Sequence, residues 1–317
     1  MESTKSDTKC NKKQPSYALV VKVKVIYYLL TETIGEITMN RRYSKVFSVL
    51  LILSLVLSVF AFSVDGSYAA ARPKYIAHRG WSSKAPENTL PAFKLAARNS
   101  GFYGVEFDIW ESSAEKSDEP LLLVMHDENI SRMCGVSKNI RSITRKTLPK
   151  YTIKSGTNVK KYPGRKIPTV NQALNIIWKY SNGAVPVIEL KHRLSSKALN
   201  YLFDLIGDHK VVIISFDYYA VTDAVKLAKK RGVSSKVQTM YLKSSQSSSK
   251  YKATANKLKK AGVSCISLKY GCVNKTLVRT FHSYGIKVCI WTVPDKSTAS
   301  KYAKMGVDYI TANGKVY

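Results

Sequence analysis

Side chains that can bind a metal ion, hold phosphate or move a proton stand at the ends of four apolar, β-branched segments. The segments read KYIAHRG, GVEFDIW, LLLVMHD and AVPVIELK. Their chemically active residues are His78, Arg79, Glu106, Asp108, His126, Glu189 and Lys191. If the segments are parallel strands, their carboxyl ends meet at one rim and bring these side chains together. The pattern therefore predicts a metal site flanked by an acid/base pair and by phosphate-binding cations.

The three carboxylates are the candidate metal ligands. Glu106 and Asp108 are two residues apart, so on a strand both side chains point to the same side. Two such carboxylates repel each other unless a cation lies between them. With Glu189 from another strand they form an all-oxygen set that suits a hard divalent ion, Ca²⁺ or Mg²⁺. The alternative is that each carboxylate pairs with a neighbouring lysine or arginine.

The two histidines are candidates for proton transfer, because each ends a strand and would flank the carboxylates. Across a phosphorus centre, one can take a proton from the attacking oxygen while the other protonates the leaving oxygen. Arg79 offers a planar fork for phosphate oxygens, and Lys191 offers a point charge. A metal ion would neutralise developing negative charge and orient the attacking hydroxyl.

Strand-like and helix-like segments alternate through residues 72–317. The strand candidates are 74–80, 104–110, 121–127, 184–191, 211–217, 236–242, 264–270, 287–293 and 308–311, and helices are expected near 88–100, 168–181, 195–208, 221–231, 249–261, 274–284 and 297–305. This alternation predicts βαβ units and a parallel sheet. The number and apolarity of the strands favour a closed (β/α)8 barrel of the TIM type. An open nucleotide-binding sheet has no support, since neither G-x-G-x-x-G nor G-x-x-x-x-G-K-[ST] occurs.

Two irregularities complicate the barrel. Nine strand candidates compete for eight places, so we expect 308–311 to be a short closing piece. The link between Glu111 and Pro120 is too polar and short for a helix. Either 121–127 runs antiparallel, or about ten extended residues, at roughly 3.3 Å each, return along the outside. We choose the second, which places His126 on the shared rim. The Lys/Arg-rich stretch at about 128–166 is expected to form a small inserted subdomain after this third strand.

Residues 1–71 are predicted to be a targeting segment. The order of its parts is that of a secretory signal: basic residues come first, then an apolar run at 46–62 without a charge, and then the small-residue stretch SYAAA. Because this run is slightly short for a membrane span of about 20 residues, an uncleaved anchor is the alternative. We therefore expect a secreted or cell-surface protein, membrane-anchored if uncleaved. Met39 offers a second start, in which case 1–38 are not used.

The chain is strongly basic, with 51 Lys and Arg against 21 Asp and Glu. Nine of the former and five of the latter lie in residues 1–71, which leaves a net charge of +26 on 72–317. No helix-turn-helix, zinc-finger or RNA-binding signature accompanies this charge, so nucleic acid is not an expected partner. An anionic membrane or wall polymer is the expected surface, and lysine decoration of helix exteriors is the alternative. Nothing in the sequence indicates an oligomeric state.

Taken together, the motifs resemble those of the glycerophosphodiester phosphodiesterase family, within the superfamily of phosphatidylinositol-phospholipase-C-like barrels. The blocks that carry the resemblance are AHRGWSSKAPENTLPAF, GVEFDIW, VMHD, IPTVNQAL, VIELK, ISFD, VCIWTV and GVDYIT. They extend from about Lys74 to Ile310, which covers nearly all of the predicted barrel. Their combined order is far more specific than any single block.

The resemblance implies a role for each candidate residue. His78 and His126 correspond to the catalytic pair, Glu106, Asp108 and Glu189 to the metal ligands, and Arg79 and Lys191 to phosphate contacts. The stretch 128–166 corresponds to the family's insertion, which covers the glycerol side of the substrate. Glu87 would support the site by hydrogen bonds or cap the following helix. Trp291 would form an apolar wall or serve only in packing.

The implied reaction is hydrolysis of a small glycerophosphodiester to glycerol 3-phosphate and an alcohol. In the family, a substrate hydroxyl can attack first and give a cyclic phosphate that water then opens. One departure concerns the last strand, where the family's Asp-x-Pro is replaced by Ala312-Asn313-Gly314; this puts the closing loop in doubt. Two other functions stay open: phospholipase-D-like action on larger lipids, and non-catalytic binding of an anionic wall polymer.

Overall fold

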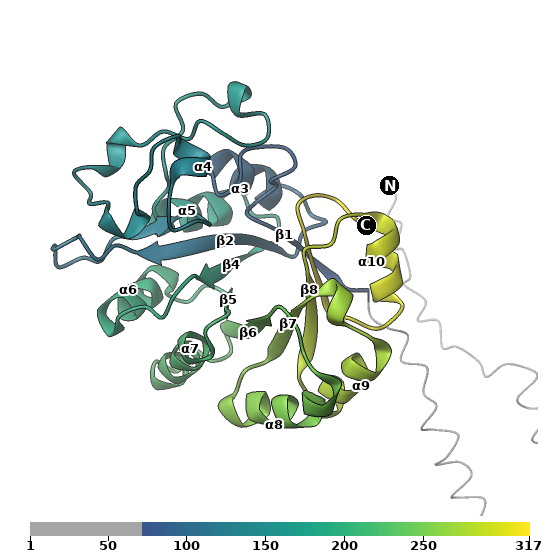
Figure 1. The fold of residues 1–317 in the computed structure, drawn as a ribbon. Helices are drawn as coiled ribbons and strands as arrows, with labels where there is room; N and C mark the ends of the chain where they lie inside the picture. The colour runs from purple at the N-terminus through teal and green to yellow at the C-terminus, as the bar shows by residue number, and fades with distance from the viewer. Residues whose placement is uncertain (1–71) are drawn as a thin grey trace, which may run out of the picture. The chain divides into compact units, whose positions relative to one another are not determined.

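Eight parallel strands close into a barrel in the computed structural model, which describes residues 72–317 (Figure 1). The strands are β1 (Lys74–Ala77), β2 (Gly104–Glu111), β4 (Val185–Leu190), β5 (Val211–Ser215), β6 (Val237–Lys243), β7 (Cys265–Lys269), β8 (Lys287–Trp291) and β9 (Tyr309–Ala312). Neighbouring strands pair in the order β1-β9-β8-β7-β6-β5-β4-β2, and pairing of β1 with β2 completes the circle. The predicted (β/α)8 barrel is therefore confirmed.

Helices cover the outside of the barrel. They are α3 (Leu90–Ala97), α5 (Val170–Tyr180), α6 (Ser196–Ile206), α7 (Tyr218–Lys230), α8 (Tyr251–Ala261), α9 (Lys275–Ser283) and α10 (Lys296–Ala303). Local chemistry sets several of their starts. At α5, the Thr169 hydroxyl accepts the backbone N–H of Gln172 and the Gln172 side chain accepts the backbone N–H of Thr169, a capping box. Asp217 caps α7 in a related way.

The strands are buried on both faces, which explains their continuous apolar runs. In β5, Ile213 joins the layer between sheet and helices, whereas Val212 and Ile214 point into the barrel. This alternation follows from the two-residue period of a strand. Met240 and Tyr309 also fill the barrel interior. The interior is thus a packed core that supports the rim above it.

The direction of the third strand was predicted wrongly. Strand β3 (Leu122–Val124) pairs antiparallel with the end of β2, Ile109 opposite Val124. β2 is eight residues long and extends outward from the barrel (Figure 1), so the chain folds back along it as a hairpin. The Met125 N–H then donates to the Asp108 carbonyl at 3.1 Å, which returns His126 to the rim. A parallel strand is therefore not needed to bring His126 to the site.

The surplus strand is accordingly β3, and β9 is a full member of the barrel. β9 pairs over four residues with β1 and also with β8. The expectation that 308–311 is only an extra closing piece was wrong. The local sequence pattern could not show which of β3 and β9 belongs to the barrel, because a short apolar run does not encode the direction or the partner of its strand.

The stretch after β3 forms a small subdomain with its own apolar cluster. It contains α4 (Ser131–Cys134) and the 3₁₀ turns η1 (Ile140–Ser142), η2 (Leu148–Lys150) and η3 (Val159–Lys161); two more turns, η4 (Ser248–Lys250) and η5 (Tyr270–Cys272), lie elsewhere. The cluster includes Leu121, Met125, Ile130, Met133, Cys134, Ile140, Ile143, Ile153 and Ile167. These buried contacts hold a segment that has little regular structure.

The predicted targeting segment, with its apolar run at 46–62, lies outside the described residues. Among residues 72–317, no helix is long and apolar enough to cross a membrane.

The cysteines of residues 72–317, which are Cys134, Cys265, Cys272 and Cys289, are free thiols.

The turn after β1 requires glycine at position 80 because there is no space for a Cβ atom, and Gly232 offers a comparison. Gly80 and Gly232 have similar positive φ angles, +73° and +70°. A Cβ at Gly80 would lie 2.8 Å from the Ala92 carbonyl carbon, whereas at Gly232 it would meet nothing within 4 Å. Both Gly→Ala changes carry the left-handed backbone cost, about 1 kcal/mol. Only Gly80→Ala adds overpacking, about 1–3 kcal/mol. Urea unfolding of both variants should show this excess, and equal losses would contradict it.

Candidate active site

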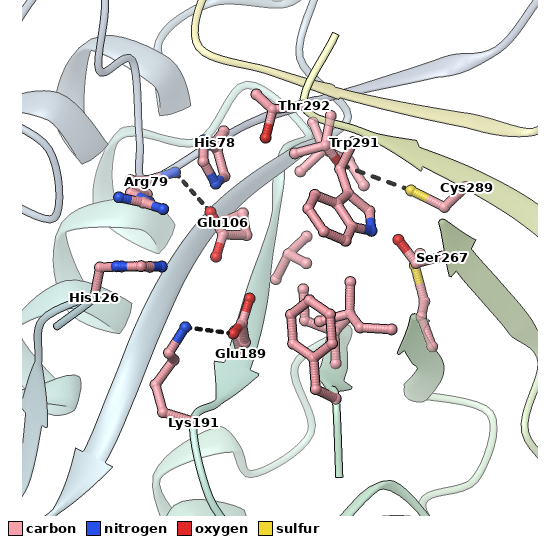
Figure 2. Close-up of a pocket in the computed structure, with 17 residues that line it drawn as sticks. His78, Arg79, Glu106, His126, Glu189, Lys191, Ser267, Cys289, Trp291 and Thr292 are labelled. Carbon is pink, nitrogen blue, oxygen red and sulfur yellow. Dashed lines mark hydrogen bonds and ion pairs between the residues drawn. The ribbon is translucent and has the colours of Figure 1, made fainter. Parts of the chain in front are cut away.

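One cavity of about 150 Å³ opens at the carboxyl ends of the strands, and it has a polar and an apolar side (Figure 2). The polar side is formed by His78, Arg79, Glu106, His126, Glu189 and Lys191. The apolar side includes Ile214, Phe216, Met240, Leu242 and Trp291. Asp108 lies behind the polar side and is fully buried. The barrel and the β2–β3 hairpin thus bring together all seven residues singled out by chemistry in the sequence.

The three carboxylates converge at the polar side. Glu106, Asp108 and Glu189 each offer an oxygen, and these oxygens lie within 4.8 Å of one another. The strand register explains this, because Asp108 of β2 is paired directly with Glu189 of β4. Burial and then repulsion by the other two carboxylates raise the pKa of Glu106 well above its usual value. Burial and Asp108 raise the pKa of Glu189 to about 7.

Two cations balance part of this charge. Lys191 Nζ lies 2.7 Å from Glu189 Oε1 and 3.4 Å from Asp108 Oδ1, and Arg79 Nε lies 3.6 Å from Asp108 Oδ2. Burial alone would raise the pKa of Asp108, but Lys191 and Arg79 lower it below its usual value. Pairing with cations, the alternative weighed from the sequence, therefore accounts for two of the three carboxylates.

Glu106 is the exception. Its Oε2 accepts the backbone N–H of Arg79 at 2.6 Å. Its Oε1 is buried and has no hydrogen-bond partner within residues 72–317. A buried carboxylate oxygen without a partner is costly, and here it faces two further carboxylates. The residues present therefore fit a divalent cation held by oxygen ligands.

The turn after β1 is unusual, and it places groups against the carboxylates. Arg79 and Asn88 both have positive φ, 54° and 55°, a conformation that is uncommon for residues other than glycine. It lets the Arg79 backbone reach Glu106. Asn88 Nδ2 donates to Asp108 Oδ2 at 2.8 Å, and its Oδ1 accepts the Asp108 N–H at 3.3 Å. Sequence reasoning missed Asn88, although it belongs to the ENT block.

Each histidine is held through Nδ1 by a different kind of partner. His78 Nδ1 lies 2.7 Å from the amide oxygen of Asn313, and His126 Nδ1 lies 2.6 Å from the carboxylate of Asp127. Burial and then the Arg79 charge lower the pKa of His78 to about 4, so its ring is neutral at pH 7. Neither partner was singled out beforehand, although Asn313 belongs to the departure from the family pattern after the last strand.

The two supporting residues also lie at the site. Glu87 Oε1 accepts from Arg79 Nη1 at 2.9 Å and from Arg132 Nη2 at 2.6 Å. The residue that precedes α3 is Thr89, so Glu87 does not cap this helix. Trp291 lines the cavity and meets the Phe216 ring edge-on, with centroids 5.5 Å apart.

Several known proteins resemble this chain in sequence. The sequence profile of the glycerophosphoryl diester phosphodiesterase family matches residues 78–313. The glycerophosphodiester phosphodiesterase of Caldanaerobacter subterraneus subsp. tengcongensis is 26% identical over 245 residues, which cover 74% of this chain and 91% of that protein. Human glycerophosphodiester phosphodiesterase 1 is 33% identical over 130 residues, 38% of each chain.

The solved structures show the same fold. An Oleispira antarctica phosphodiesterase, in complex with the product sn-glycerol-3-phosphate, superimposes with a TM-score of 0.63 at 23% identity. The superposition covers 76% of this chain and 93% of that chain. The family profile spans most of this chain and includes every residue of the polar side of the cavity. This chain therefore belongs to the glycerophosphoryl diester phosphodiesterase family of enzymes.

Proposed function

We propose that this protein hydrolyses small glycerophosphodiesters to glycerol 3-phosphate and an alcohol, with one divalent cation and two histidines. The observation that carries the proposal is the polar side of the cavity, where acid/base groups, carboxylates and phosphate-binding cations face one another within one small volume. Membership of the family and the names of its relatives support the same reaction.

The cation would be held by Glu106, Asp108 and Glu189, since their oxygens converge and one of them has no protein partner in the described part of the chain. A divalent ion there supplies Lewis-acid stabilisation of negative charge and favours the deprotonated form of a hydroxyl. An all-oxygen site suits both Ca²⁺ and Mg²⁺.

The two histidines have surroundings that suit opposite roles. We assign the base to His78, because Asn313 can accept its Nδ1 proton and leave Nε2 unprotonated. His78 then takes the proton of the attacking hydroxyl, whether this belongs to the substrate or to water. We assign the acid to His126, because the Asp127 carboxylate can accept from its Nδ1 and orients the ring so that Nε2 can donate to the leaving oxygen.

Phosphate oxygens would be bound by Arg79 and Lys191, whose charged ends lie beside the carboxylates. Burial would lower the pKa of Lys191, but Asp108 and Glu189 raise it, so this side chain stays charged. The carbon skeleton of the substrate would lie against Trp291 on the apolar side.

A second candidate is phospholipase-D-like action on larger lipids. Phe216 contacts Trp291 at the cavity, and its side chain is 44% exposed. Tyr219, three residues later at the start of α7, is 64% exposed. Exposed aromatic side chains beside a cavity can contact an acyl chain or a lipid surface. A role restricted to binding anionic wall polymer is less well supported, because it would not require converging carboxylates.

We also propose that the protein acts outside the cytoplasm, on the basis of the apolar run at 46–62. Sequencing the N-terminus of the mature protein from its native source tests this. A start between the run and Arg72 is expected, whereas an intact run would indicate an anchor.

Replacing either histidine should remove most of the activity. His78→Ala and His126→Ala should each lower kcat by about 10²–10⁴-fold, the usual contribution of a general acid or base. His209→Ala is the matched control, because His209 stacks on Trp178 outside the cavity. The assay measures glycerol 3-phosphate release from glycerophosphocholine and, in parallel, choline release from lysophosphatidylcholine, each with Ca²⁺, Mg²⁺ or EDTA. If the wild type hydrolyses no glycerophosphodiester with either ion, the proposed function is wrong.

The cation should reverse the stability order of wild type and Glu106→Gln. In EDTA, Glu106→Gln should be at least as stable as wild type, because it removes a buried carboxyl that is repelled by Asp108 and Glu189 when ionised and whose Oε1 lacks a partner. With Ca²⁺ or Mg²⁺ at a hundredfold excess over Kd, wild type should gain about 2.7 kcal/mol, and Glu106→Gln should gain much less. Thermal unfolding measures both, with exposed Glu128→Gln as control. Equal gains in wild type and Glu106→Gln would exclude this site.

Cation binding should strengthen as pH rises through about 7. Folding raises the pKa of Glu189 from its usual value, about 4.5, to about 7, so the folded state binds this proton more tightly than the unfolded state. The cation-free protein therefore loses stability as the pH rises from about 4.5 to about 7. A cation must displace this proton. The dissociation constant should therefore fall by up to about tenfold per pH unit for each proton displaced. Calorimetry between pH 5.5 and 8 measures it; a flat profile contradicts the assignment, and Glu189→Gln should reduce the slope.

A further inference from the structure

One arginine of the inserted subdomain holds two carboxylates that support different parts of the active site. Arg132 Nε donates to Asp127 Oδ2 at 2.5 Å, and its Nη2 donates to Glu87 Oε1 at 2.6 Å. The other oxygen of Asp127 contacts His126 Nδ1 at 2.6 Å, and Glu87 Oε1 also accepts from Arg79 Nη1 at 2.9 Å. Two chains of contacts, one from the histidine and one from the phosphate-binding arginine, thus meet at a single guanidinium.

The backbone of Arg132 is fixed by the residues around it. α4 is a single turn, but Ile130, Met133 and Cys134 are buried in the apolar cluster of the subdomain. The turn ends at Gly135, whose positive φ of 70° lets its N–H return to the Ser131 carbonyl. Burial on one side of the turn presents the Arg132 side chain on the other, towards the site.

The subdomain also packs on the loop that carries Glu87. A Cβ at Gly156 would lie 3.0 Å from Pro86 Cβ, so the two backbones approach closely. Asn158 Nδ2 donates to the Lys84 carbonyl at 3.1 Å. The distance between Arg132 and Glu87 is therefore set by backbone packing as well as by the ion pair.

Charge keeps both carboxylates available to Arg132. Burial alone would raise the pKa of Glu87, but Arg132 and Arg79 lower it below its usual value. Burial would likewise raise the pKa of Asp127, and Arg132 and His126 lower it. Both groups are ionised at neutral pH. A planar guanidinium can donate to two carboxylates in different directions at once, which the single ammonium of lysine does less well.

We propose that Arg132 is a positioning residue that sets the orientation of His126 through Asp127 and of Arg79 through Glu87, so that the inserted subdomain completes the active site. The inference rests on the proposed function for its kinetic part. Small displacements of positioned groups can reduce turnover by about 10²-fold. Loss of Arg132 should therefore affect proton transfer and phosphate binding together, whereas loss of either carboxylate should affect mainly one of them.

The test compares Arg132→Met and Arg132→Lys with Asp127→Asn and Glu87→Gln. We expect Arg132→Met to lower kcat by about 10–100-fold and to weaken binding of inorganic phosphate by about tenfold. Asp127→Asn should lower mainly kcat, and Glu87→Gln should weaken mainly phosphate binding and raise KM. Arg132→Lys should fall between wild type and Arg132→Met. Combining Arg132→Met with Asp127→Asn should cost less in kcat than the product of the single effects, because both act through His126.

Arg145→Met is the matched control. Arg145 lies in the same subdomain, is similarly exposed, and pairs with Glu119 away from the cavity. The inference is overturned if Arg132→Met, folded by circular dichroism, retains kcat and phosphate affinity within about twofold of Arg145→Met. If Arg132→Met does not fold, the same criterion applies to Arg132→Lys, which keeps the charge. If the wild type hydrolyses no diester, the proposed function fails, and calorimetric phosphate binding by the same variants still decides the role of Arg132.

Discussion

The burial of three carboxylates within 4.8 Å of one another is the constraint on which the rest of the site depends. Desolvation and mutual repulsion would make this arrangement strongly unfavourable on its own. Neighbouring groups offset part of this cost. The Lys191 and Arg79 side chains pair with Asp108, the Asn88 amide donates to Asp108, and the Arg79 backbone N–H donates to Glu106. Even so, Glu106 Oε1 has no hydrogen-bond partner among the described residues, and the divalent cation that we propose would supply one.

Such a site needs a scaffold that cannot relax to separate the charges. The packed barrel interior provides it, since apolar side chains from most strands fill the space beneath the rim. Closure of the barrel also joins the two ends of the described chain. The pairing of β1 with β9 places Asn313 beside His78, although 235 positions separate them. A change in the final loop therefore acts directly on a candidate catalytic group.

The cavity has two chemically different halves, one polar and one apolar, which suit different parts of a diester. The polar half carries the groups that we propose bind the phosphate and transfer protons, whereas Trp291 and Phe216 offer only apolar contact. The inserted subdomain contacts residues that support the polar half through Arg132. Under the proposed roles, reaction chemistry and substrate choice depend on different parts of the chain, so that substrate choice can vary while the chemistry is kept.

The sequence by itself determined the barrel, through the alternation of apolar strands and helices. It also singled out seven candidate site residues, six of which lie together because functional groups at the ends of parallel strands share a rim; His126 joins them through the β2–β3 hairpin. These are local patterns, read within one element at a time. Only the tertiary structure decided that β3 runs antiparallel, that β9 belongs to the barrel, and that Asn88, Asp127, Arg132 and Asn313 support the site. The reason is that strand direction, and most of these supporting hydrogen bonds, depend on which distant segments meet, and packing of the whole chain alone settles that.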